Sequence, residues 1–121
     1  MSHRILIVDD EPNIVISLEY LMKKEGFQVA VATDGETALQ LASSFVPDLI
    51  LLDVMMPKKS GFEVCQALRA DPALAATKII MLTAKGRETA VTKGLALGAD
   101  VYITKPFSTK NLVHQIRSLL E

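Results

Sequence analysis

Three carboxylates come directly after two short apolar segments of the chain. Asp9 and Asp10 follow residues 5–8, and Asp53 follows residues 49–52. If both segments are neighbouring strands of one parallel sheet, these side chains meet at the same edge of that sheet. Like charges packed together raise one another's pKa unless a cation neutralises them, and a hard divalent cation with oxygen ligands is the simplest remedy. The pattern therefore predicts a Mg²⁺ site.

A hydroxyl and an ammonium group complete this set. Thr83 ends a further apolar segment, and Lys105 follows the last one. A carboxylate nucleophile, a metal, a hydrogen-bond donor and a fixed cation are the parts needed to receive a phosphoryl group and to stabilise its charged oxygens. We therefore interpret these strand ends as a candidate phosphoryl-acceptor site.

Simpler explanations stay open for single residues. Asp10 could cap the helix that opens at residues 11–12, and Asp53 could bond only to backbone amides of the loop at residues 55–61. The chemical interpretation is favoured by the joint pattern, because a chance assembly of all these groups at four strand ends would be a rare coincidence.

Five apolar segments alternate with helix-length amphipathic patterns, and these elements must position the site. The expected strands are residues 5–8, 28–31, 49–52, 79–82 and 101–103, and the expected helices lie around residues 14–22, 38–42, 64–68, 87–97 and 109–120. The strands are apolar on both faces, as strands covered on both sides are. Right-handed crossovers then predict an α/β, flavodoxin-like, doubly wound parallel sheet of five strands in the order 2-1-3-4-5 with five helices.

The composition fits one folded domain spanning residues 1–121. The chain has 14 acidic and 13 basic side chains, a formal net charge of −1, and half of its residues are hydrophobic, so neither a strongly basic nucleic-acid-binding surface nor a disordered chain is indicated. The apolar runs are far shorter than the roughly 20 residues that span a bilayer, and no secretory signal is recognisable. A lone cysteine, Cys65, fits a reducing compartment. We expect a soluble, cytoplasmic protein.

These residues resemble a known family, the receiver domains of two-component response regulators, over essentially the whole chain. The resemblance rests on ILIVDDEP at residues 5–12, LLDVMMP at 51–57, TA at 83–84 and KPF at 105–107 after GAD at 98–100. Each motif alone is weak. Their order and their spacing relative to the expected strands make the joint pattern specific.

The resemblance implies a phosphoprotein that forms an aspartyl phosphate. Asp53 would be the phosphoacceptor, Asp10, Asp53 and the backbone carbonyl of Met55 would bind Mg²⁺ directly, and Asp9 would act through a metal-bound water. The phosphoryl group would come from a phosphohistidine of a sensor histidine kinase or a histidine phosphotransfer protein, as in phosphorelay signal transduction. Such a domain promotes its own phosphorylation and dephosphorylation but turns over no separate substrate, so it is a signalling switch and not an enzyme.

The resemblance also implies how the phosphoryl group is held and sensed. Thr83 would donate a hydrogen bond to one phosphoryl oxygen, Lys105 would pair with another, and the bond from Lys105 to Pro106 would be cis. Thr83 would move toward the phosphoryl group and the ring of Tyr102 would turn inward behind it, although an aromatic residue in a strand can equally be ordinary packing. The switched surface would be helix 4, strand 5 and helix 5, read by an effector domain or protein, without direct nucleic-acid or membrane binding and with a homodimer on phosphorylation left open.

Two positions would tune dephosphorylation, Met55 and Lys85, because in this family they influence how water reaches the aspartyl phosphate. Lys85 could instead be a solvated surface charge.

Three other functions stay open. An aspartyl-phosphate phosphatase or mutase would carry Asp-x-Asp-x-Thr on strand 1, whereas this chain has DDEP at residues 9–12. A flavin or nucleotide carrier would cradle phosphate with small-residue amides at the same place, where the acidic residues repel it. A phosphate-independent receiver-like scaffold would be expected to lose one of five motif residues, and none of them is missing here: Asp9, Asp10, Asp53, Thr83 and Lys105. Both a stand-alone receiver and a piece of a larger regulator or hybrid kinase fit the sequence.

Overall fold

The computed structural model describes residues 3–56, 59–84, 93 and 95–121, in which helices and strands alternate. The strands are β1 (Arg4–Val8), β2 (Gln28–Ala32), β3 (Leu49–Asp53), β4 (Lys78–Ala84) and β5 (Val101–Lys105). The helices are α1 (Pro12–Lys24), α2 (Gly35–Phe45), α3 (Gly61–Ala70) and α5 (Thr109–Leu120). The helix expected at residues 87–97 lies mostly outside the described residues, within which positions 93, 95 and 96 are helical.

All five strands belong to one parallel sheet in the order β2-β1-β3-β4-β5. This confirms the predicted flavodoxin-like topology, with β1 and β3 side by side. Strands β2, β3, β4 and β5 extend further than expected at the edge where the carboxylates were placed, because ladder pairing continues there, whereas β1 ends at Val8 as expected. Asp53 pairs with Leu82, and Thr83 pairs with Thr104. Thr83 therefore lies inside β4, and both Asp53 and Lys105 are the last residues of their strands.

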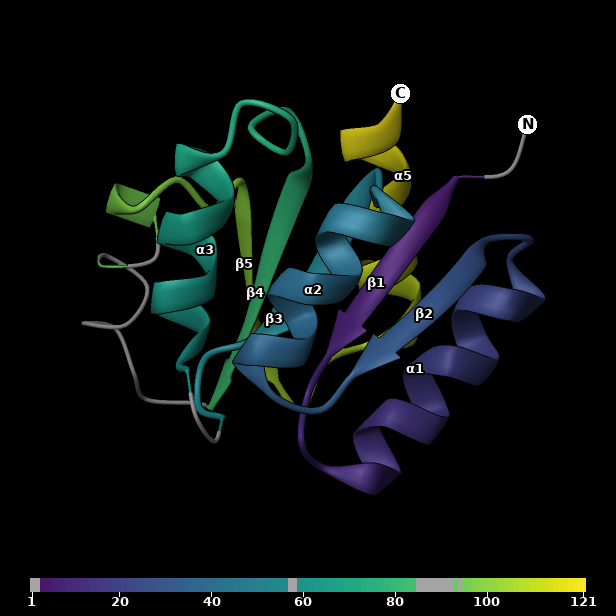
Figure 1. Cartoon of the computed structure of the whole chain (residues 1–121). Coiled ribbons are helices and arrows are strands. Elements are labelled where there is room, and N and C mark those ends of the chain that lie inside the picture. The colour runs from purple at the N-terminus through teal and green to yellow at the C-terminus, as the bar shows by residue number, and fades with distance from the viewer. Residues whose placement is uncertain (1–2, 57–58, 85–92, 94) are drawn as a thin grey trace.

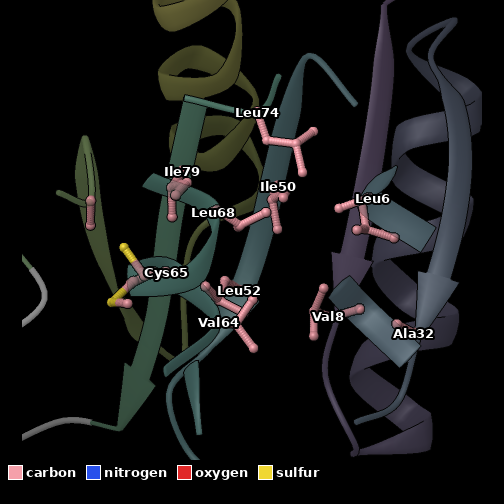
Figure 2. Close-up of a cluster of buried hydrophobic side chains, with 14 of the residues drawn as sticks. Leu6, Val8, Ala32, Ile50, Leu52, Val64, Cys65, Leu68, Leu74 and Ile79 are labelled. Atoms are coloured by element: carbon pink, nitrogen blue, oxygen red, sulfur yellow. The ribbon is translucent and has the colours of Figure 1, made fainter. Parts of the chain in front are cut away.

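Helices cover both faces of the sheet (Figure 1). On one face, α1 and α5 supply Leu18, Met22, Leu112 and Ile116 to a buried cluster with alternate strand residues. On the other face, α2 and α3 contribute to a second cluster, and Figure 2 shows side chains of α3 against β3 and β4. Each large aliphatic side chain buried here stabilises the fold by roughly 1.5–3 kcal/mol. These two buried clusters hold in place the sheet edge at which the polar residues lie.

Cys65 lies in the second cluster, where it is completely buried (Figure 2). Its Sγ atom is 3.6 Å from the carbonyl oxygen of Leu97, and burial raises the pKa of its thiol. Cys65 is therefore a packing residue of this cluster.

Local sequence signals mark the starts of the helices. Pro12 stands in the first turn of α1, and the side chains of Asp34 and Ser108 accept hydrogen bonds from the first turns of α2 and α5. Ser60 and Glu63 form a reciprocal capping box at the start of α3. Among the helices that the structure describes, none is long and apolar enough to cross a membrane.

Candidate functional site

The three carboxylates singled out in the sequence meet at the carboxyl ends of β1 and β3. Asp9, Asp10 and Asp53 each offer an oxygen, and these oxygens lie within 4.8 Å of one another. Asp9 is completely buried and Asp53 nearly so, whereas Asp10 is exposed. Asp10 does not cap α1, because the N-cap position belongs to Glu11. The capping explanation for Asp10 is therefore wrong, and its carboxylate is left beside the other two.

Lys105 brings its ammonium group to the same place from the far edge of the sheet. Its Nζ atom lies 2.9 Å from Asp9 Oδ2, 3.4 Å from Asp53 Oδ1 and 3.4 Å from Glu11 Oε1. Burial lowers the pKa of this ammonium, but the hydrogen bond to Asp9 and the surrounding carboxylate charges outweigh that effect and raise it. Lys105 is therefore a fixed cation. The Lys105–Pro106 peptide bond is cis, as expected.

Asp53 is an electrostatically destabilised carboxylate. Burial, and after it the charge of Asp9, raise its pKa from 3.8 to about 6, against the opposing charge of Lys105. A backbone hydrogen bond from Met55 also favours the ionised form. At neutral pH the side chain is thus largely ionised but poorly compensated, a state that favours binding of positive charge or reaction with an electrophile.

Thr83 is a buried residue whose hydroxyl makes no hydrogen bond within the described part of the chain. It is 2% exposed, and among the described residues its Oγ1 atom has no hydrogen-bond partner. Because a buried hydroxyl without a partner costs about 1–3 kcal/mol, such a group is usually satisfied. Thr83 adjoins Leu82, which pairs with Asp53 across the ladder. The hydroxyl is therefore available to a group that arrives at the edge next to Asp53.

The site residues lie on both faces of the sheet. Asp53 and Lys105 stand two residues beyond Leu51 and Ile103, which belong to the cluster under α1 and α5. Thr83 stands two residues beyond Met81 in the opposite cluster, against which Tyr102 also packs. Strand alternation therefore puts Thr83 and Tyr102 on one face, and Asp53 and Lys105 on the other. Tyr102 is half-buried and pairs with Met81, away from the carboxylates.

The loop after β3 approaches the site through its backbone. Met55 is 59% exposed. Gly61 N donates to the carbonyl oxygen of Val54 at 2.8 Å, and a Cβ atom at position 61 would collide with the backbone of Asp53. Glycine is thus required where α3 starts. Lys85, the other expected tuning residue, lies outside the described residues.

The donor set fits a hard divalent cation. Carboxylate oxygens are the ligands that Mg²⁺ prefers, and the three aspartates place three negative charges against the single ammonium of Lys105. Motif reasoning missed Glu11, whose carboxylate adds a further negative charge at this edge. Its position directly after the acidic pair was the available signal.

Comparisons with known proteins agree with this geometry. A family model described as the response regulator receiver domain matches residues 5–117. The chain is 47% identical over 120 residues to the alkaline phosphatase synthesis transcriptional regulatory protein PhoP of Bacillus subtilis, covering 99% of this chain and 49% of that protein. The chain thus spans about half the length of this curated relative.

Solved structures show the same architecture. The chemotaxis response regulator CheY4 of Vibrio cholerae is 32% identical with a TM-score of 0.93, covering 99% of this chain and 100% of that one. The signal receiver domain of a signal transduction histidine kinase from Syntrophus aciditrophicus is 34% identical with a TM-score of 0.91, covering 98% of this chain and 90% of that one.

Proposed function

Because this chain belongs to the response regulator receiver domain family of two-component systems, we propose that it is a switch that accepts a phosphoryl group on Asp53. Receiver domains of response regulators are signalling switches, and residues 1–121 would form one such domain. The observation that carries the proposal is the convergence of Asp9, Asp53 and Lys105 at one sheet edge, with Lys105 Nζ 3.4 Å from Asp53 Oδ1.

The transfer step starts from the Asp53 carboxylate before it carries a phosphoryl group. An oxygen of Asp53 attacks the phosphorus of a partner's phosphohistidine and forms an O–P bond. The P–N bond breaks, and its electron pair stays on the imidazole nitrogen, which takes up a proton. Because the carboxylate and the phosphoryl oxygens repel each other, positive charge must lie between them. Lys105 supplies one charge and stabilises the transferred group.

Mg²⁺ would be held by Asp10, Asp53 and the carbonyl of Met55, with Asp9 acting through water, and when bound it supplies further positive charge to the reacting oxygens. The ion pair with Lys105 orients the buried Asp9 carboxylate at the site. The exposure of Asp10 leaves an open side for a donor to approach. With an exposed side chain at its rim, Met55 would control access of water to the product.

The same residues account for a switch. Thr83 would donate its hydroxyl to a phosphoryl oxygen and so gain the partner that it lacks. A movement of Thr83 would vacate space on the face that it shares with Tyr102, and the ring would turn into it. The surface expected from β5, α5 and the helix predicted at residues 87–97 would then present a changed face to an effector domain or protein. The phosphate shifts the populations of two existing states.

Intact-mass measurement tests the proposal. The protein is incubated with acetyl phosphate and Mg²⁺, so that acetate leaves as the phosphoryl group is transferred. We expect the mass of one phosphoryl group on the wild type and none on Asp53→Asn or with a chelator. An unchanged mass in every sample, under conditions that label a known receiver, would instead favour a phosphate-independent scaffold.

A further inference from the structure

Glu11 contacts the candidate site without a role in the proposed transfer step. Its Oε1 atom lies 3.4 Å from Lys105 Nζ. Glu11 is the N-cap residue of α1, yet its side chain makes no capping hydrogen bond. Its backbone N–H donates to Asp9 Oδ1 at 2.9 Å, and Pro12 follows in the first turn of the helix. The backbone of Glu11 is therefore held in place while its carboxylate is directed to the lysine.

The carboxylates of Asp9, Asp53 and Glu11 share the ammonium group of Lys105. They differ in how much stabilisation each would lose if this ammonium group moved away. The side chain of Asp9 is 0% exposed, that of Asp53 is 8% exposed and that of Glu11 is 61% exposed. Water can replace Lys105 at Glu11, since an exposed ion pair contributes little. Water cannot replace it at Asp9, where the buried charge would be left uncompensated. Glu11 is therefore the partner that Lys105 releases at least cost.

We propose that Glu11 is a positioning residue that holds the Lys105 ammonium in the free protein and gives it up to the phosphoryl group. This inference rests on the proposed function. Lys105 keeps its hydrogen bond to Asp9 throughout and exchanges Glu11 for a phosphoryl oxygen. Glu11 thus keeps part of the lysine's hydrogen-bonding capacity away from Asp53 before transfer and competes with the phosphoryl group afterwards.

A double-mutant cycle on beryllofluoride binding tests this competition. Beryllofluoride becomes tetrahedral when its beryllium binds a carboxylate oxygen, and it then mimics a phosphoryl group on that oxygen. It is titrated, at saturating Mg²⁺, into the wild type, Glu11→Gln, Lys105→Met and the double variant. We expect Glu11→Gln to tighten binding by about 1.5- to fivefold when Lys105 is present, and to have no effect in the Lys105→Met background.

Glu19→Gln is the matched control. It makes the same charge change on the same helix, but Glu19 pairs with Lys23 and not with Lys105. Equal tightening by Glu19→Gln, or by Glu11→Gln in both lysine backgrounds, would overturn the proposal, because the effect would then be one of overall charge. A wild type that binds no beryllofluoride would remove the proposed function and this inference together, whereas binding without the coupling removes only the inference.

A second measurement does not depend on the mimic. The NMR signals of the Lys105 side-chain methylene next to Nζ are recorded in the free protein, with Lys105→Arg used for assignment. We expect these signals to shift in Glu11→Gln and to stay in place in Glu19→Gln. Unshifted signals in Glu11→Gln would show that Glu11 does not hold the lysine.

Discussion

Lys105 Nζ lies 2.9 Å from Asp9 Oδ2, and the Asp9 side chain is completely buried. The two residues are 96 positions apart in the chain: Asp9 follows β1 and Lys105 ends β5, two strands that do not pair because β3 and β4 lie between them. The long side chain of Lys105 therefore ties the edge strand to the centre of the sheet. This ion pair is both a structural link and a source of positive charge at the candidate site.

Replacing Lys105 with methionine leaves Asp9 buried without a counter-charge. We expect Lys105→Met to lower the free energy of unfolding by about 3–5 kcal/mol at pH 7 without divalent cations. Urea unfolding measures this change. Lys23→Met, which breaks the exposed pair with Glu19, is the control and should cost less than about 1 kcal/mol. Equal small losses in both variants would show that the Asp9 pair contributes little.

Asp53 makes stability depend on pH. Its pKa is raised from 3.8 to about 6, so the native protein binds this proton more tightly than the unfolded chain does, and the stabilisation that it brings is lost as the pH rises through 6. In the absence of Mg²⁺, Asp53→Asn should therefore be more stable than the wild type above pH 6, by an amount on the order of 2–3 kcal/mol, and equally stable near pH 4. Urea unfolding across this range checks the prediction, and a difference that does not change with pH would contradict it.

The Thr83 hydroxyl has no hydrogen-bond partner among the described residues, so its removal should affect phosphoryl binding and not folding. Thr83→Val removes an unpaired buried hydroxyl with little change of shape, so the free energy of unfolding should stay the same or rise by about 1 kcal/mol. Binding of beryllofluoride should weaken by roughly tenfold or more, because the hydrogen bond from the hydroxyl to a fluorine that stands in for a phosphoryl oxygen is lost. Thr104→Val, at the exposed position paired with Thr83, is the matched control. Unchanged affinity in Thr83→Val would exclude the hydroxyl as a phosphoryl ligand.

Cation binding should be visible as stabilisation of the free protein. At ten times its dissociation constant, Mg²⁺ should add about 1.4 kcal/mol and raise the melting temperature by roughly 3–8 °C. Asp10→Asn should lose most of this gain while folding normally, because Asp10 is exposed. Thermal unfolding with NaCl at equal ionic strength controls for screening. The same gain in Asp10→Asn would place the cation elsewhere.

Much of this architecture could be predicted because apolar segments, helix periodicity and strand-end polar residues all pointed to one topology. The carboxylates at positions 9 and 53 converge because β1 and β3 are neighbours. The carboxyl-terminal end of β4 was predicted too early, at residue 82, because ladder pairing and not hydropathy decides where this strand stops.

Contacts made by long side chains could not be predicted in the same way. The bond between Lys105 and Glu11 depends on how an N-cap residue is oriented by its backbone, and no pattern of hydropathy records that. The unpaired state of Thr83 depends on everything packed around it.

Chemical trapping of the acceptor tests the central claim most directly. The protein is phosphorylated with acetyl phosphate and Mg²⁺ and then treated with borohydride, which reduces an aspartyl phosphate to the alcohol. Peptide mass mapping locates the reduced residue. We predict homoserine in place of aspartate at position 53 and at no other acidic residue. Reduction at Asp9 or Asp10, or a phosphoryl group retained on a histidine or hydroxyl side chain with Asp53 unmodified, would contradict the account.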